Sequence, residues 1–300
     1  MNILVTGATG LLGRSVFRQL AANPDWQVTG TCHSRSGPGL LPLDLSEPGQ
    51  IRNALEQLQP DVVIHCAAER WPDRCANQPD AAWALNVDAT ALLAGACEEL
   101  GAQLVYISTD YVFDGTAPPY SADARPAPIN FYGRSKRAGE EAVLACHGHW
   151  VLRLPLLFGP VEEPRESGVT ALLDTIRTRE PMALDHWAIR YPTSVEEVAS
   201  VLEQCLRLKA GGEILSGIYH WSGDTACTRF ELAMMIADLL QLDCRHISAD
   251  SAPHFVEPRP QNCQLDKARL LALGIRGGAP LPQQLASVLR PLHGEPVESG

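Results

Sequence analysis

Short apolar runs alternate with amphipathic segments over the first half of the chain. The runs at 3–6, 28–31, 41–43, 62–65, 104–108 and 151–154 are rich in Val, Leu and Ile. The segments between them repeat their apolar residues with a helical period. Strands that are apolar on both faces and separated by helices are typical of a parallel sheet covered on both sides. The pattern predicts an α/β fold with a Rossmann-type doubly wound parallel sheet, in which ligands bind at the carboxyl ends of the strands.

The pattern loosens after Pro155 and indicates a second, smaller lobe. Helices are expected near 169–178, 194–209 and 229–242, with a late strand at 217–221 and short helices from Asp266. A chain of 300 residues is near the size at which a single core stops growing. We predict a Rossmann domain over 1–160 plus about 192–221, a smaller C-terminal α/β lobe over about 161–191 plus 222–293, and a loose tail over 294–300.

Three glycines stand between the first apolar run and the first amphipathic segment. Gly7, Gly10 and Gly13 lie in the stretch TGATGLLG. In a strand-to-helix turn, such glycines allow a sharp bend, a close approach to a pyrophosphate and tight packing of the helix, whose first amides face the anion. The spacing also fits an ordinary tight turn. Its place between a strand and a helix favours a nucleotide cofactor.

A tyrosine and a lysine four residues apart open the helix that follows the fifth long strand. Tyr132 and Lys136 lie in the stretch YGRSK, and this spacing puts them on one helical face. A phenol has a pKa near 10, so it needs a nearby positive charge to act at neutral pH, and Lys136 would supply one. Thr109, after the strand, would hold a substrate carbonyl. The group predicts reduction of a carbonyl, or the reverse, with a nicotinamide cofactor; a solvated helix pair is the alternative.

The end of the second strand indicates which nicotinamide cofactor binds. No acidic residue stands between Asp25 and Asp44, whereas an NAD site usually has one there for the ribose hydroxyls. An arginine at this place suits a 2′-phosphate and favours NADP over NAD. The expected phosphate site is His33, Ser34 and Arg35, the expected adenine neighbours are Asp44 and Leu45, and the small residues beside the cofactor are Cys66 and Ala67. Cys66 fits core packing equally well.

Composition narrows the range of partners. A net charge of -11 argues against a nucleic-acid surface or an anionic membrane as the main partner, and no apolar run approaches the roughly 20 residues of a membrane span. Met1 leads directly into a strand, so we expect no signal peptide and a cytoplasmic location. The nine cysteines form no CxxC pair, which predicts neither a disulfide framework nor a zinc site. His147 and His149 lack neighbouring ligands, so no metal is expected.

The chain resembles the extended short-chain dehydrogenase/reductase family, and within it the dTDP-4-dehydrorhamnose reductase group. The matching stretches span nearly the whole chain: TGATGLLGR, STDYVFDGT, YGRSK, RLPLLFG, YPTSVEEVA and RPQNCQLD. Four further stretches resemble the NADP-binding regulatory beta subunits of methionine adenosyltransferase: HCAAERWPD, NQPDAA, LDHW and YHWSG.

The resemblance implies an NADP-binding Rossmann domain, a substrate-binding smaller lobe, and Thr109, Tyr132 and Lys136 as the catalytic residues. The implied cofactor contacts are Gly10, Leu11, Leu12, Gly13, His33, Ser34, Arg35, Asp44, Leu45, Cys66, Arg70, Tyr132, Lys136 and Leu157. The candidate substrate residues are Asp110, Tyr111, Trp187 and Arg259. Trp187 fits a core aromatic equally well, and the Arg259 guanidinium, between two prolines, suits a phosphate group.

Two hypotheses of function follow. The favoured one is an NADPH-dependent reductase of a nucleotide-sugar-type ketone; the alternative is an NADP-binding regulatory subunit whose partner is the catalytic subunit of methionine adenosyltransferase. The stretch 69–71 departs from the rhamnose-pathway reductases. Residues 294–300 carry two acidic residues and neither a basic nor an aromatic one, unlike the tail of the beta subunits.

Overall fold

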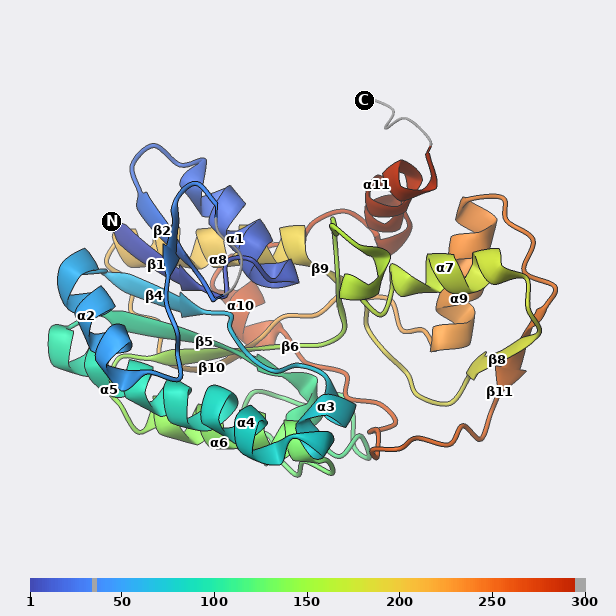
Figure 1. The fold of residues 1–300 in the computed structure, drawn as a ribbon, viewed down its shortest axis with the longest axis horizontal. Coiled ribbons are helices and arrows are strands. Elements are labelled where there is room, and N and C mark those ends of the chain that lie inside the picture. Colours follow the sequence, from blue (N-terminus) through green and yellow to red (C-terminus); the bar gives the residue numbers. More distant parts are fainter. Residues whose placement is uncertain (34–36, 295–300) are drawn as a thin grey trace.

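The computed structural model describes residues 1–33 and 37–294. A seven-stranded parallel sheet forms the centre of the larger lobe (Figure 1). Its strands stand in the order β10-β6-β5-β4-β1-β2-β3. Their bounds are β1 Asn2–Thr6, β2 Gln27–Cys32, β3 Leu40–Pro42, β4 Val62–His65, β5 Gln103–Thr109, β6 Trp150–Leu154 and β10 Gly217–His220. The predicted doubly wound parallel sheet is confirmed.

The winding of the sheet reverses at β1, which lies between β2 and β4. Val5 pairs with Gly30 on one side and with Ile64 on the other. The connections after β1 and β4 therefore leave the sheet in opposite directions, and a crevice opens between them at the carboxyl ends of the strands. The crevice lies beside the turn that carries the glycines.

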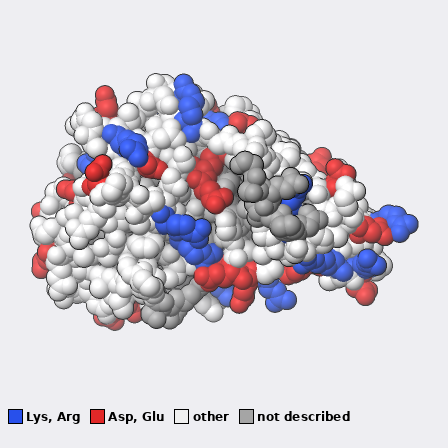
Figure 2. Space-filling model, turned by 90° about the horizontal axis from the view of Figure 1, so that it is seen from above, with Lys and Arg blue, Asp and Glu red and all other residues white. Residues whose placement is uncertain are grey.

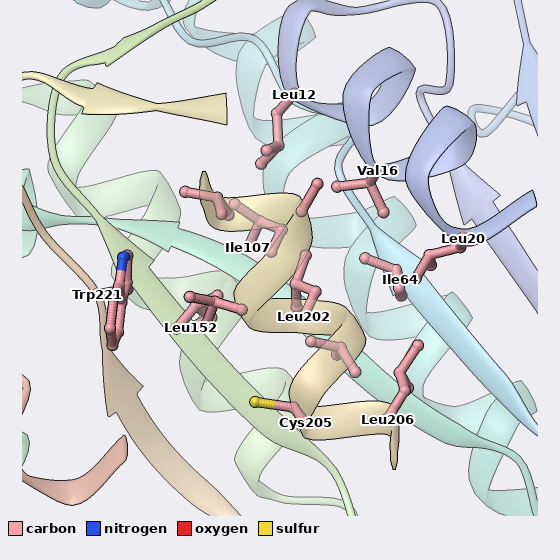
Figure 3. Close-up of a cluster of buried hydrophobic side chains, with 14 of the residues drawn as sticks. Leu12, Val16, Leu20, Ile64, Ile107, Leu152, Leu202, Cys205, Leu206 and Trp221 are labelled. Atoms are coloured by element: carbon pink, nitrogen blue, oxygen red, sulfur yellow. The ribbon is translucent and has the colours of Figure 1, made fainter. Parts of the chain in front are cut away.

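Helices cover both faces of the sheet (Figure 1). One face carries α1 (Leu11–Ala21) and α8 (Val195–Ala210); the other carries α2 (Pro48–Leu58), α5 (Ala89–Leu100) and α6 (Phe131–Leu144). In α1 the apolar residues recur every four positions and form one stripe. This stripe packs against α8 and the sheet; Figure 3 shows Leu12, Val16, Leu20, Leu202 and Leu206 in that core. The sheet is therefore buried on both sides, as its continuous apolar strands require.

The smaller lobe has its own core of helices and a two-stranded parallel sheet. Its elements are α7 (Ala171–Thr178), β8 (Met182–Asp185), α9 (Arg229–Leu239), β11 (Ile247–Asp250) and α11 (Leu281–His293). Leu173, Ile236 and Leu285 meet in this core. A short strand pair, β7 (Leu157–Phe158) with β9 (Thr193–Ser194), joins it to the larger lobe.

The boundary between the lobes that we predict from sequence stays a proposal. Within the stretch assigned to the smaller lobe, α10 (Ala268–Ala272) packs beside the larger sheet, because Leu270 and Ile275 join the core formed by α1 and α8. The tail predicted over 294–300 lies, except for Gly294, outside the described residues.

Shorter elements follow β4 and line the crevice. They are α3 (Pro72–Asn77), α4 (Pro79–Trp83), the π-helical segment η1 (Ala84–Asp88), the 3-10 turn η2 (Asp110–Val112) and the 3-10 turn η3 (Pro164–Glu166).

Figure 2 shows acidic and basic side chains interspersed over one face of the molecule. Across residues 1–33 and 37–294, no helix is both long and apolar enough to cross a membrane.

Candidate active site

Two cavities adjoin at the carboxyl edge of the sheet. The first, of about 730 Å³, extends from the glycine turn past the ends of β2, β4 and β5. The second, of about 480 Å³, lies between the larger and the smaller lobe. Six residues line both cavities: Arg70, Trp71, Thr109, Tyr132, Pro155 and Leu157. These six residues mark the place where a ligand in one cavity would meet a ligand in the other.

The glycine turn is wound too tightly for side chains at two of its positions. Gly7 has φ +66°, and a Cβ there would lie 2.8 Å from the backbone nitrogen of Ala67. A Cβ at Gly13 would lie 2.2 Å from the carbonyl oxygen of Gly7. Gly10 and the first residues of α1 line the first cavity. The turn thus presents bare backbone and a helix N-terminus to the cavity, which is an arrangement that binds anions.

The described residues predicted to bind the cofactor all line the first cavity. They are Gly7, Gly10, Leu11, Leu12, Gly13, His33, Asp44, Leu45, Cys66, Ala67, Arg70, Tyr132, Lys136 and Leu157. Ser34 and Arg35, predicted for the 2′-phosphate, lie outside the described residues. Beside them, the His33 Nε2 atom is 3.6 Å from an oxygen of Asp44. Hydrogen bonds from Ser46 lower the pKa of that carboxyl group.

Thr109 and Tyr132 lie where the two cavities join, and Lys136, four residues after Tyr132 on α6, lines the first cavity. Burial raises the pKa of the Tyr132 phenol, and its hydrogen bond with Thr109 acts in the opposite direction. Burial lowers the pKa of Lys136 to about 7, while the charge of Glu140 opposes this shift. Near neutral pH the phenol is therefore protonated, and Lys136 can change its charge.

A buried polar network lies behind Lys136. Both oxygens of Glu140 accept hydrogen bonds from Arg153, each at 2.7 Å, and the side chains of both residues have no exposed surface. The Ser108 hydroxyl donates to Glu140 at 2.6 Å. Sequence reasoning did not single out this network, because its members come from β5, α6 and β6. The only signal was a charged residue within an apolar strand, Arg153.

Asn86 is a second residue that the sequence analysis missed. It lies in the π-helical segment η1, and π-turns occur often at functional sites. Its side chain accepts from the Glu69 backbone amide at 2.9 Å and donates to the Glu69 carbonyl and to Ser135, each at 3.0 Å. Asn86 therefore fixes the loop that carries Arg70 and Trp71. A lone Asn at a buried position of an apolar helix was the available signal.

Arginines surround the second cavity: Arg70, Arg190, Arg229 and Arg259. Arg190 donates to the Tyr111 hydroxyl at 3.3 Å and to the Pro260 carbonyl at 3.0 Å. Arg259 reaches across from the smaller lobe to both carboxylate oxygens of Asp73 on α3, each at 3.0 Å. Arg229 makes no hydrogen bond and no ion pair with the residues that the structure describes. Asp73, Asp110 and Asp185 line the same cavity, so guanidinium and carboxylate groups share it, and Arg259 already has an acidic partner.

The structure brings three of the four predicted substrate residues to the second cavity. Asp110, Tyr111 and Arg259 line it. Burial raises the pKa of Asp110 to about 6, with Arg190 acting in the opposite direction. Trp187 is not among the lining residues of this cavity; its ring centroid lies 6.1 Å from that of Phe255, and Phe255 lines the cavity instead.

The two histidines considered as metal ligands have separate partners. His147 is exposed and lies 3.0 Å from Glu98. His149 is buried, and its ring nitrogens lie 3.2 Å from the Leu104 amide and 3.0 Å from the Ala94 carbonyl. The described part of the chain holds no group of three His, Cys, Asp or Glu residues that fits a metal ion. His149 thus serves to join β5 to α5.

The amino-acid sequence is similar to those of known proteins. The family described as RmlD substrate binding domain matches residues 1–293. Methionine adenosyltransferase 2 subunit beta of Pongo abelii is 43% identical over 277 residues, which cover 91% of this chain and 83% of that protein. A probable dTDP-4,6-dihydroxy-2-methyloxan-3-one 4-ketoreductase of Streptomyces antibioticus is 34% identical over 268 residues, which cover 87% of this chain and 84% of that protein.

A solved structure gives the same result at the level of the fold. The dTDP-4-dehydrorhamnose reductase of Bacillus anthracis, in complex with NADP, has a TM-score of 0.84 and 27% identity, with 96% of this chain and 98% of that chain covered. Sequence and structure therefore agree over nearly the whole length. The chain belongs to the RmlD substrate binding domain family of extended short-chain dehydrogenases/reductases.

Proposed function

We propose that the protein is an NADPH-dependent reductase of a nucleotide-sugar-type ketone. The observation that carries this proposal is the position of Thr109 and Tyr132 at the junction of the two cavities, with Lys136 lining the first cavity. A phenol at this place borders both the space that fits a dinucleotide and the space that fits a substrate.

The first cavity fits a nicotinamide dinucleotide. The turn is so tightly wound that a Cβ at Gly7 or Gly13 would collide with the backbone. The turn therefore presents the backbone of Gly10 and the N-terminus of α1 to a pyrophosphate. Asp44 and Leu45 would contact the adenosine, and Leu157 the other end. When bound, the cofactor supplies the hydride that reduces a carbonyl carbon.

The preference for NADP rests on Arg35. If its guanidinium pairs with the 2′-phosphate, Arg35→Ala should weaken NADPH binding by about 1.5 to 3 kcal/mol and leave NADH binding nearly unchanged. Titration calorimetry with both nucleotides measures this difference. Equal losses for the two nucleotides would contradict the assignment.

The residues of this chain supply the proton and the alignment. The Thr109 hydroxyl would hold the substrate carbonyl oxygen, and burial keeps the Tyr132 phenol protonated, which is the form that would donate a proton to that oxygen. The positive charge of Lys136 then stabilises the phenolate that remains.

The second cavity suits an anionic substrate. Guanidinium groups bind phosphate oxygens in a bidentate manner, and four of them line this space. Arg229 makes no hydrogen bond or close ion pair with the described residues, and only the more distant charge of Asp185 acts on it, so it is the cation that we expect to bind a diphosphate. Asp110 and Tyr111, beside Thr109, would then contact the sugar hydroxyls.

The test is oxidation of NADPH by the purified protein with a dTDP-4-keto-6-deoxy sugar. We expect turnover that depends on both compounds and is lost in Tyr132→Phe. A preceding thermal-shift screen of nucleotide sugars, with NADPH present, selects the substrate, because a ligand that binds the folded form raises its melting temperature. A lack of turnover with every nucleotide sugar that binds would contradict the proposal.

A second candidate function is regulation of methionine adenosyltransferase. It is favoured by the 43% identity to a methionine adenosyltransferase 2 subunit beta. Titration calorimetry with the methionine adenosyltransferase of the same organism tests it. A sub-micromolar complex that survives deletion of 294–300 and changes that enzyme's kinetics would support the regulatory function; no complex would support a self-sufficient reductase.

We also propose a cytoplasmic location. All nine cysteines are free thiols in the structure, and Cys75, Cys97 and Cys205 are buried in the larger lobe. Unpaired thiols of this number are usual in a reducing compartment.

A further inference from the structure

The ammonium group of Lys136 lies over the face of an aromatic ring. The Nζ atom is 4.0 Å from the ring centroid of Tyr106, a residue of β5 with no exposed surface. The Tyr106 hydroxyl points away and donates to the Asn86 carbonyl at 3.3 Å. The negative face of an aromatic ring attracts a cation, and more strongly where water is excluded. The face of the Tyr106 ring thus lies where it can stabilise the positive charge of Lys136.

A glycine in α6 keeps this contact close. Gly139 follows Lys136 by less than one turn, and a Cβ there would lie 2.3 Å from the Tyr106 hydroxyl oxygen and 2.7 Å from the Asn86 carbonyl oxygen. Any side chain at this position would push α6 away from β5. The lack of a side chain at Gly139 therefore sets the distance between α6, which carries Lys136, and the Tyr106 ring.

The other titratable groups that face Lys136 are uncharged or share their charge with another residue. Burial raises the pKa of Cys66, after β4, and of Cys75, on α3, to about 12, so both are neutral thiols. Burial lowers the pKa of His65, on β4, to about 3, so this ring is neutral as well. On α6 itself, Tyr132 is protonated, and Glu140 shares its charge with Arg153 of β6.

Among the residues that the structure describes, Lys136 has no polar partner of its own. It makes no hydrogen bond and no ion pair within 4.0 Å with residues 1–33 and 37–294. A buried ammonium without a partner is costly, and its pKa is lowered by that burial. The face of the Tyr106 ring and the more distant carboxylate of Glu140 both favour its charged form.

We propose that Tyr106 is a positioning residue that keeps Lys136 charged and aligned beside Tyr132. Its effect on catalysis rests on the proposed reductase function, but its effect on Lys136 does not. A lysine stays charged below its pKa. Loss of the ring should therefore make Lys136 neutral at a lower pH, and the decline of activity at alkaline pH should begin earlier.

The experiment observes the lysine directly. The chain has only three lysines, Lys136, Lys209 and Lys267, so protein labelled with ¹³C at the lysine ε-carbon gives three side-chain signals. Lys209→Arg and Lys267→Arg assign two of them, and a pH titration of the third gives the pKa of Lys136. No substrate or turnover is needed.

Two substitutions separate the ring from the hydroxyl. Tyr106→Leu removes the ring, and we expect the pKa of Lys136 to fall by about one unit. Tyr106→Phe keeps the ring and loses the hydroxyl with its hydrogen bond to Asn86, so the pKa of Lys136 should stay within about 0.3 unit of the wild-type value. An unchanged pKa in Tyr106→Leu, or an equal shift in both variants, would overturn the proposal.

A third variant preserves the shape of the buried ring and covers the case in which Tyr106→Leu does not fold. Tyr106→3,4,5-trifluorophenylalanine keeps the size of phenylalanine but withdraws negative charge from the ring face. We expect a pKa of Lys136 about half a unit below that of Tyr106→Phe. Equal values in these two variants would show that the ring only fills space.

The pH profile of kcat/KM for ketone reduction then separates this proposal from the proposed function. A shift of its alkaline limb that follows the pKa of Lys136 across the variants supports both. If no ketone is reduced while the titrations shift as expected, the reductase assignment is wrong and the role of Tyr106 stands.

Discussion

The two sides of the cleft are held together by different kinds of contact. On the side of the larger lobe, the ion pair of Glu140 with Arg153 has no exposed surface at either residue. Across the cleft, Asp73 of the larger lobe is 52% exposed in its ion pair with Arg259 of the smaller lobe. A buried pair loses several kcal/mol when one partner is removed, whereas an exposed pair contributes about 1 kcal/mol or less.

This difference in contacts indicates a different role for each side of the cleft. The groups that would move a proton stand against a dry network in which Glu140 accepts hydrogen bonds from Arg153 and Ser108, so the geometry there does not depend on a ligand. The arginines that would bind a substrate lie on loops and helix ends and are held by weaker contacts, so they can adjust. We infer that the chemistry is set by the larger lobe and that specificity can change on the smaller lobe without loss of the fold.

The largest expected effect comes from breaking the buried pair. Glu140→Gln leaves Arg153 as an uncompensated buried charge, and we expect the free energy of unfolding to fall by about 3 to 5 kcal/mol. Urea unfolding followed by circular dichroism measures it. Glu141→Gln is the matched control, because this neighbouring acid is 61% exposed in its pair with Arg137 and should change stability by less than about 0.5 kcal/mol. Equal effects would remove the contrast between the two sides.

Removing the phenol should abolish chemistry while leaving binding intact. Tyr132→Phe deletes the proposed proton donor, and we expect kcat to fall by about 100-fold or more with little change in NADPH affinity or melting temperature. Steady-state kinetics and NADPH fluorescence titration measure the two parts. A variant with undiminished kcat would mean that the proton comes from another group.

Acid should weaken the larger lobe through its buried histidines. Burial lowers the pKa of His65 and of His220 from 6.5 to about 3, so the folded protein keeps them neutral while the unfolded chain takes up protons below pH 6.5. Stability is therefore complete above about pH 6.5 and falls toward pH 3, by about 1.4 kcal/mol per pH unit for each histidine. Urea unfolding between pH 7 and pH 4 measures the slope. In His65→Gln the slope should be smaller by about 1.4 kcal/mol per pH unit. An unchanged slope would contradict the account.

The smallest expected effect belongs to the exposed pair. Asp73→Asn frees Arg259 from its acidic partner, so we expect dTDP to bind about two- to fivefold more tightly, with stability changed by less than about 1 kcal/mol. Titration calorimetry with dTDP measures the affinity. Asp123→Asn, which breaks the exposed pair with Arg269 away from both cavities, is the control. Weaker binding in Asp73→Asn would show instead that Asp73 orients Arg259 for the substrate.

The sequence was most informative where one short segment carries both the structure and the chemistry. The glycine turn and the pair Tyr132 and Lys136 could be predicted because their spacing alone places them: Gly7 to Gly13 within one strand-to-helix turn, and the pair on one helical face. The described cofactor residues predicted from the resemblance line the first cavity for the same reason, since they belong to segments with fixed places at the sheet edge.

Contacts between distant segments could not be predicted in this way. Tyr106 lies under Lys136 only because β5 and α6 pack together through Gly139, and Arg259 meets Asp73 only because the two lobes face each other. Phe255, rather than Trp187, lines the second cavity because of the path of a loop in the smaller lobe. No periodicity in the sequence reports such pairings.

Transfer of deuterium tests the central claim most directly. The purified protein is given NADPH deuterated at the reactive carbon of the nicotinamide, in each of its two stereochemical forms, together with the nucleotide sugar that binds best. Mass spectrometry then follows the sugar. A reductase that acts through Tyr132 should transfer the deuterium from one form only, to a product that Tyr132→Phe forms about 100-fold or more slowly. A nucleotide sugar that binds beside NADPH yet never acquires deuterium would contradict the account and favour the regulatory function.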